Sequence, residues 1–307
     1  MDIREHWFDE GAPLFRQAIE ESDAVLPPGD FYMCPCCMIA FSREAVTEKV
    51  LTEEHVPPRK TGGKGLLLTC SSCNSTHGSK FDSHEVIRKA ILRAARGEDP
   101  KRNLRATFEV AGIEMPCKAY FVDGKVIARA TGTHPDNATA HAEALERAKE
   151  SKDFSSLKFR VHEPHDPGLA DVSLIRSAYL ATFIALGWPY ILENTLTTLS
   201  PIRDQLMKGP AIPTLTLRSL VGRVSDLPDG SRKMTLVEHP PELESVLVTI
   251  DQNVIFLPDP WGVHSCEDLS QAVGRCRDDQ GWVSVSASGK NVPWPSPFDN
   301  RYLLNRI

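Results

Sequence analysis

The stretch that decides the fold runs from residue 34 to residue 84 and contains CPCC (34–37), LTEEHVPPRKTGG (51–63) and LLLTCSSCNSTHGSKFDSH (66–84). It holds two Cys-x-x-Cys knuckles that are separated by 32 residues, Cys34/Cys37 and Cys70/Cys73. Four thiolates in two pairs are what a closed tetrahedral Zn²⁺ site requires. Cysteines clustered in this way favour a metal over disulfides in a chain without a secretory signal, so the pattern predicts one structural zinc site.

The residues between and after the knuckles carry further chemistry. Val50-Leu51-Thr52 and Leu66-Leu67-Leu68 are predicted to form a hairpin that bears Glu54 and His55. An imidazole can accept a proton from water, which makes His55 the candidate general base. Asn74 directly follows the last knuckle cysteine, and its neutral oxygen suits a hard cation. His77 is three residues further along the predicted helix and shares a face with Asn74.

The order of these parts resembles the HNH, or ββα-metal, nucleases of the zinc-knuckle type. The matching elements are Cys34-Cys37, Glu54-His55-Val56-Pro57, Gly62-Gly63 and Leu68-Thr69-Cys70-Ser71-Ser72-Cys73-Asn74, with Gly78 after them. The resemblance covers roughly residues 31–100. It implies that a distorted strand brings Glu54 and His55 to one site, where Glu54 and Asn74 hold Mg²⁺ or Mn²⁺ and His55 activates water. His77 would be a third ligand, a contact to the scissile phosphate, or only a surface residue.

The chain departs from the family pattern at three positions. Glu54 stands where the family more often has Asp, Gly65 replaces an Asn that orients the loop and the base histidine, and His77 replaces a Lys before the helix glycine. No side chain is therefore an obvious hydrogen-bond partner that would fix the tautomer of His55. We expect a backbone carbonyl in that role.

The charge distribution favours a nucleic-acid partner near the motif. The whole chain has a net charge of −6, yet residues 59–105 contain eleven Lys or Arg against four acids, a net of +7. A basic segment on an acidic body fits a phosphate-binding surface, whereas a solvated helix face is the alternative explanation. The predicted nucleic-acid-binding residues are Arg59, Lys60, Lys64, Lys80, Lys89, Arg93 and Arg96.

The fold class expected for the chain is multidomain α+β. We predict an N-terminal helix within residues 1–30 (about 13–22), the zinc-stapled HNH domain at 31–100, and a small α+β region at 101–166. A helical pair and a mainly β region of unknown role follow at 167–307. Within these parts the predicted elements are a helix from Asn74 to about Arg96, a hairpin around Asp123-Gly124, a helix from Pro135 to Glu150, and adjoining strands around Asp251-Gln252.

The expected activity is metal-dependent hydrolysis of phosphodiester bonds in nucleic acid, with DNA favoured over RNA. Two alternatives stay open: a zinc-knuckle module that binds nucleic acid or protein without turnover, and a nuclease effector of a defence or mobile-element system whose C-terminal half contacts a partner protein. The segment Leu174–Leu186 is too short to span a bilayer and predicts a buried helix. The N-terminus lacks a secretory signal, so we expect a cytoplasmic protein.

Overall fold

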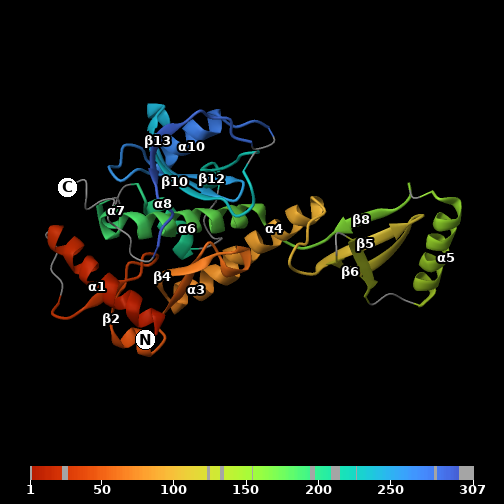
Figure 1. Ribbon diagram of the computed structural model, residues 1–307, viewed down its shortest axis with the longest axis horizontal. Coiled ribbons are helices and arrows are strands. Elements are labelled where there is room, and N and C mark those ends of the chain that lie inside the picture. Colours follow the sequence, from red (N-terminus) through yellow and green to blue (C-terminus); the bar gives the residue numbers. More distant parts are fainter. Residues whose placement is uncertain are drawn as a thin grey trace. The chain divides into compact units, whose positions relative to one another are not determined.

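The computed structural model describes residues 2–22, 27–122, 125–131, 135–153, 155–193, 198–208, 215–225, 227–279 and 282–296. The chain forms two compact units, of which the first joins Met1–Glu85 to Pro167–Ile307 and the second comprises Val86–Asp166 (Figure 1). The boundary predicted between residues 166 and 167 coincides with this division. The boundary predicted at residue 100 does not, because the knuckle region and the C-terminal half share one hydrophobic core.

The first helix is longer than predicted. Helix α1 spans Ile3–Glu21, and the side chain of Asp2 caps it by accepting a hydrogen bond from the Arg4 amide. The expectation of a helix from about residue 13 missed its first half. That half forms because Trp7 and Phe8 are buried on the same side as Phe15.

The knuckle region contains the predicted hairpin and helix. Strands β1 (Phe31–Met33) and β2 (Ala40–Ser42) pair around the first knuckle, and α2 (Glu44–Thr47) leads into the hairpin. Strand β3 (Leu51–Val56) pairs antiparallel with β4 (Lys64–Cys70), and the turn η1 (Arg59–Thr61) lies between them. Three helical segments then follow one another: α3 (Ser71–His77), the π-helical η2 (Gly78–Asp82) and α4 (Ser83–Ala95). The helix begins at Ser71 rather than Asn74 because the Cys70 sulfur accepts a hydrogen bond from the Cys73 amide as its N-terminal cap.

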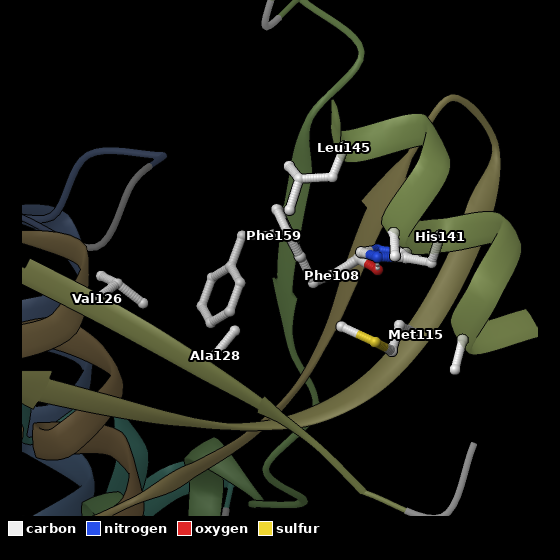
Figure 2. A pocket seen from close by; sticks show the side chains of 9 residues that line it. Phe108, Met115, Val126, Ala128, His141, Leu145 and Phe159 are labelled. Carbon is white, nitrogen blue, oxygen red and sulfur yellow. Dashed lines mark hydrogen bonds between the residues drawn. The ribbon is translucent and has the colours of Figure 1, made fainter. Parts of the chain in front are cut away.

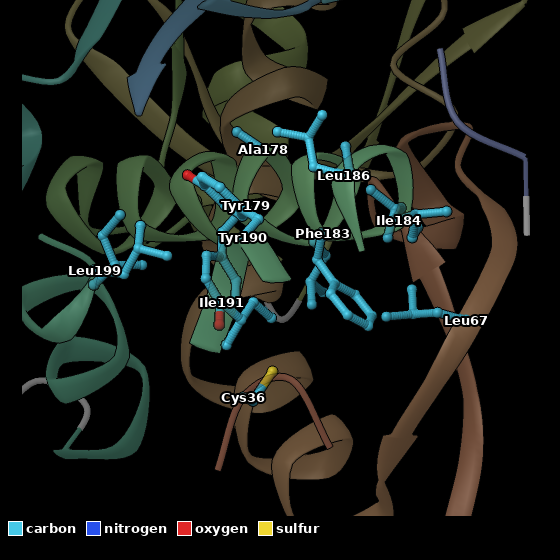
Figure 3. Close-up of a cluster of buried hydrophobic side chains, with 14 of the residues drawn as sticks. Cys36, Leu67, Ala178, Tyr179, Phe183, Ile184, Leu186, Tyr190, Ile191 and Leu199 are labelled. Carbon is cyan, nitrogen blue, oxygen red and sulfur yellow. The ribbon is translucent and has the colours of Figure 1, made fainter. Parts of the chain in front are cut away.

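The C-terminal half of the first unit places helix α6 (Pro167–Leu186) in the core. This helix is apolar and long enough to cross a membrane by composition alone, but 89% of its most apolar window is buried inside the protein. Its aromatic residues pack with those of α7 (Trp188–Glu193), and Figure 3 shows Tyr179, Phe183 and Tyr190 in this cluster together with Leu67 of β4. The prediction that this segment is a buried helix is confirmed.

A five-stranded sheet completes the first unit. Its strand order is β13-β10-β11-β12-β9, and all the pairings between these strands are antiparallel. The strands predicted around Asp251-Gln252 are β11 (Ser245–Ile250) and β12 (Asn253–Leu257). The other members are β9 (Val221–Arg223), β10 (Arg232–His239) and β13 (Ser288–Val292), and helices α8 (Ser200–Lys208), α9 (Leu215–Arg218) and α10 (Cys266–Arg275) belong to the same unit.

The second unit is a four-stranded antiparallel sheet with the order β7-β6-β5-β8. Its strands are β5 (Leu104–Val110), β6 (Ile113–Val122), β7 (Lys125–Ala130) and β8 (Lys158–Val161), and the predicted turn at Asp123-Gly124 lies outside the described residues. Helix α5 (Pro135–Ser151) confirms the predicted helix and packs beside the sheet (Figure 1). Between α5 and the sheet is a cavity of about 540 Å³, whose walls are apolar side chains such as Met115 and Leu145 except at His141 (Figure 2).

Candidate functional site

The four knuckle cysteines form a cluster in the first unit. The sulfur atoms of Cys34, Cys37, Cys70 and Cys73 all lie within 4.8 Å of one another, close enough to hold a metal ion. Strand β1 delivers the first pair, and the junction of β4 with α3 delivers the second. The two segments meet because Tyr32, buried beside Cys34, donates a hydrogen bond to the backbone oxygen of Leu68 and accepts one from its amide.

The donor set fits a tetrahedral thiolate site. Four sulfurs at 2.3 Å from a common centre lie roughly 3.8 Å apart, and the Sγ atoms of Cys37 and Cys70 are 3.8 Å apart. The Cys70 amide donates to the Cys34 sulfur and the Cys73 amide to the Cys70 sulfur, each over 3.4 Å. Backbone donors of this kind stabilise negative charge on sulfur, so the cluster is prepared for a cation. Of the other four cysteines, Cys36, Cys117 and Cys266 are buried and Cys276 is partly exposed.

The β3–β4 pairing shifts by one residue at the centre of the motif. Glu54 is opposite Leu67, whereas His55 is opposite Gly65, so Leu66 has no partner on β3. A bulge of this kind increases the local twist and redirects nearby side chains. The distortion that the family resemblance implies is therefore present, although it does not bring Glu54 and His55 to one site.

Glu54 is held inside the core, which corrects its predicted role as a ligand of the catalytic metal. Its side chain is 3% exposed, and Oε2 accepts hydrogen bonds from the guanidinium of Arg176 on α6 and from the hydroxyl of Thr69. Its Oε1 accepts from the His55 amide over 3.0 Å. Strand alternation points this carboxylate toward α6, where a fixed cation already neutralises it.

The same guanidinium binds two further groups. Arg176 Nη1 donates to Asp82 over 3.2 Å, and Nε donates to Nδ1 of His77 over 2.9 Å. Burial raises the pKa of both Glu54 and Asp82, and the charge of Arg176 opposes that shift in each case. Ser173, one turn earlier on α6, donates to the second oxygen of Asp82. The result is a buried network that fastens α6 to the hairpin and to η2.

His77 belongs to this network and not to an open metal site. It is 1% exposed, its Nε2 lies 3.1 Å from the backbone oxygen of Leu206, and its Nδ1 accepts from Arg176. These contacts assign the neutral tautomer that carries its proton on Nε2. Burial and the charge of Arg176 lower the pKa of His77 to about 3, so the ring stays neutral near pH 7. The prediction that it binds metal or phosphate, and the alternative that it is a surface residue, are both wrong.

His55 lies on the exposed side of the hairpin beside a carboxylate that the sequence prediction did not name. Its Nε2 is 3.7 Å from Glu53 Oε1, and the two side chains are 24% and 39% exposed. Gly65 opposite makes room for this arrangement, because a Cβ built there would lie 1.8 Å from Glu53 Oε1. The expected partner of His55 was a backbone carbonyl, whereas the structure places the carboxylate of Glu53, two residues earlier, beside its ring.

Asn74 connects helix α3 to strand β3 of the hairpin. Its amide nitrogen donates to Thr52 Oγ1 over 3.1 Å and to the backbone oxygen of Glu53 over 2.9 Å. The amide oxygen makes no hydrogen bond among the described residues and remains available as a hard ligand. His55 therefore lies beside the Glu53 side chain and Asn74 beside the Glu53 backbone, whereas Glu54 and His77 belong to the buried network.

The predicted cations divide between the two units. Arg59, Lys60 and Lys64 are exposed at the tip of the hairpin, and Lys64 is opposite Val56, the residue after His55. Lys80 is exposed on η2. Lys89 and Arg93 are in the part of α4 that belongs to the second unit, and Arg96 directly follows that helix. Arg93 and Arg96 both pair with Glu98.

Two residues of this region had signals that the sequence prediction did not use. Glu53 is two positions before His55, and side chains two apart on a strand share a face. Arg176 is a cation in the middle of the most apolar helix of the chain, and arginine is almost never fully buried unless it is paired. Comparisons bring no outside support, because no family model, curated protein or solved structure matches the chain.

Proposed function

We propose that the chain is a metal-dependent phosphodiester hydrolase that cuts nucleic acid, with His55 as its general base. One observation carries the proposal: a partly exposed imidazole lies beside the Glu53 carboxylate, on a hairpin fixed to a four-cysteine cluster. The order of the motif, knuckle–Glu-His–knuckle–Asn, supports the same reading.

His55 and Glu53 supply the proton transfer. The Glu53 carboxylate faces Nε2, so it favours the tautomer with a proton on Nε2 and leaves Nδ1 to accept a proton from water. The hydroxide then attacks phosphorus, the bond to the 3′ oxygen breaks, and Glu53 stabilises the imidazolium that forms. The separation of 3.7 Å exceeds a hydrogen bond, as it often does in a site without substrate.

Two donors, one on the hairpin and one on the adjoining helix α3, suit a hard divalent cation. The carboxylate of Glu53 and the free amide oxygen of Asn74 are oxygen donors, which Mg²⁺ and Mn²⁺ prefer. Such an ion would stabilise the charge that develops on the phosphate and the leaving oxygen. The four cysteines would hold a separate structural Zn²⁺ that fixes helix α3, and with it Asn74, against the hairpin.

Three cations beside the hairpin support nucleic acid as the substrate. Arg59, Lys60 and Lys64 make no ion pair among the described residues, so their charges are available for phosphates. They belong to the turn and strand start that adjoin His55.

The test is cleavage of plasmid, single-stranded DNA and RNA in the presence of Mg²⁺ or Mn²⁺. His55→Ala should reduce the rate by about a hundred- to ten-thousand-fold, because it removes the base but not the binding surface. Glu53→Gln should also reduce it, and excess metal should restore part of the loss. The matched control is His239→Ala, which changes an exposed histidine at the end of β10 and should leave the rate unchanged. The proposal is wrong if wild-type and His55→Ala proteins, each from two independent preparations, cut equally fast.

A second candidate function is a zinc-knuckle binding module without turnover. The observation that favours it is the Arg176 guanidinium, which occupies the position beside Glu54 where the family resemblance expects a divalent cation. A fixed guanidinium neutralises the acid but cannot lower the pKa of a bound water as a metal does. Nucleic-acid binding with no cleavage under any metal would support this candidate and reject the first.

A further inference from the structure

The sheet of the second unit has one covered face and one exposed face. Alternate residues of β5 and β6, among them Leu104, Ala106, Cys117 and Ala119, are buried against Ala90 of α4. Helix α5 packs on β6 as well. The intervening residues of each strand point to the opposite face, and most of them are exposed.

Positive charge is concentrated on the exposed face. The second unit contains fifteen Lys or Arg and twelve Asp or Glu, a net of +3 within a chain of net −6. The exposed face holds two of those acids, Glu109 and Glu114, and six of those cations: Arg105, Lys118, Lys125, Arg129, Lys158 and Arg160. The whole positive excess of the unit therefore belongs to this face.

Three of the cations form a row across three strands. Arg105 on β5 is directly opposite Lys118 on β6, and Lys118 is directly opposite Arg129 on β7. The amide of His162 donates to the Arg105 carbonyl, which places His162 next to the row on the β8 side. Like charges directly opposite one another destabilise a sheet. The row thus lowers the stability of the sheet. Such a cost is expected where a negatively charged ligand neutralises the cations.

The acids on this face do not neutralise the row. Glu109 pairs with Lys158 and Arg160, and Glu114 pairs with Arg160, at the other end of the face. Among the described residues, the side chains of Arg105, Lys118 and Arg129 make no ion pair. Glu163 lies close by, but it pairs with Arg102 and accepts a hydrogen bond from the Arg105 backbone.

An aromatic ring adjoins the row. Tyr120 is two residues after Lys118 on β6 and points to the same face, opposite Ile127. The guanidinium of Arg129 lies 5.3 Å from the centre of its ring. Cations that follow a backbone beside an aromatic ring on which a base can stack are the combination used by surfaces that bind single strands.

We propose that this face binds single-stranded nucleic acid, with Arg105, Lys118 and Arg129 contacting successive phosphates and the Tyr120–Arg129 pair stacking on a base. The exposed sheet face presents these groups side by side on neighbouring strands, where an unpaired strand can reach them. The proposal does not depend on the chemistry of His55, since binding is measured without added divalent cation.

The test uses the full chain and a short fluorescent oligodeoxythymidylate, titrated over a range of salt concentrations. The triple variant Arg105→Gln/Lys118→Gln/Arg129→Gln should bind about 100-fold more weakly at about 0.1 M salt, and its log–log salt slope should be shallower by about 2. The matched control removes the same charge from α5 and the residue after it, through Arg147→Gln/Lys149→Gln/Lys152→Gln, and should bind like wild type. The triple variant should unfold at the wild-type temperature or above it, because the opposed like charges are gone.

Three results would overturn the proposal. The first is a triple variant that binds within about tenfold of the control triple, since three lost phosphate contacts demand more. The second is Tyr120→Leu binding the oligonucleotide as wild type does, because loss of a stacked base should weaken it about fivefold or more. The third is polyglutamate competing as well as the oligonucleotide, which would identify the face as a site for acidic protein.

Discussion

Replacing Arg176 by Met removes the one cation of the buried network and keeps the length of the side chain. Arg176 is 1% exposed and binds Glu54, Asp82 and His77 at once. Removing one partner of a buried ion pair costs about 3–5 kcal/mol. Domain stabilities are about 5–15 kcal/mol, so we expect the first unit to lose about a fifth of its stability or more.

The loss should depend on pH in a defined direction. Burial raises the pKa of Glu54 and Asp82, and without Arg176 the shift is larger still. A group whose folded pKa is raised contributes its full stability below its unfolded pKa and loses it as the pH rises through the folded pKa. The difference in unfolding free energy between wild type and Arg176→Met should therefore be greater at about pH 8 than at about pH 5.5.

Urea unfolding followed by tryptophan fluorescence is a suitable assay, because all five tryptophans belong to the first unit. Arg218→Met is the control; this exposed arginine pairs with Asp171 at the surface, and its loss should cost at most about 1 kcal/mol. Adding Glu54→Gln and Asp82→Asn to Arg176→Met should recover most of the stability. A loss below about 1 kcal/mol, or one that is equal at both pH values, would refute the account of the network.

Three further substitutions test other parts of the first unit. Cys70→Ser should lower the zinc content from about one equivalent, measured by elemental analysis, and unfold the knuckle region, because ligation and folding are coupled; full zinc and full stability would contradict the site. Gly65→Ala should displace the Glu53 carboxylate and slow cleavage, while the free energy of unfolding changes by about 1 kcal/mol or less. Unchanged cleavage would contradict the role of Glu53 in the reaction. His77→Gln should reduce the loss of stability as pH falls below about 6.5, since the native ring stays neutral to about pH 3 while the unfolded chain takes up a proton; an acid-side stability curve that matches wild type would exclude the buried neutral ring.

Local patterns predicted much of the first unit. Cysteine spacing located the four-thiol cluster, and the apolar run from Leu174 located the buried part of α6. The pairing around Asp251-Gln252 followed from two adjoining β-rich segments. Each of these patterns involves only a few neighbouring residues or the spacing between identical ligands. It can therefore be recognised without knowledge of the tertiary fold.

The roles of the two glutamates depended on contacts that local patterns do not contain. Glu54 and Arg176 are 122 residues apart, and only the packing of α6 against the hairpin decides which acid is buried. The shift in register leaves Leu66 on β4 without a partner on β3. The sequence of β3 alone does not specify this detail of the pairing. Sequence therefore located the hairpin correctly and assigned the wrong acid to its exposed face.

The insertion of the second unit into the first has a consequence for the order of events on the ribosome. Arg176 is made 99 residues after His77, and chains grow at about 5–20 residues per second, so roughly 5–20 s separate them. During that interval all four knuckle cysteines have been made, whereas the acid at position 54 still lacks its cation and stays in water. The four cysteines can thus come together early, but the hairpin cannot bury Glu54 until α6 emerges. The nascent chain therefore has an incomplete first unit while the residues of the second one are made.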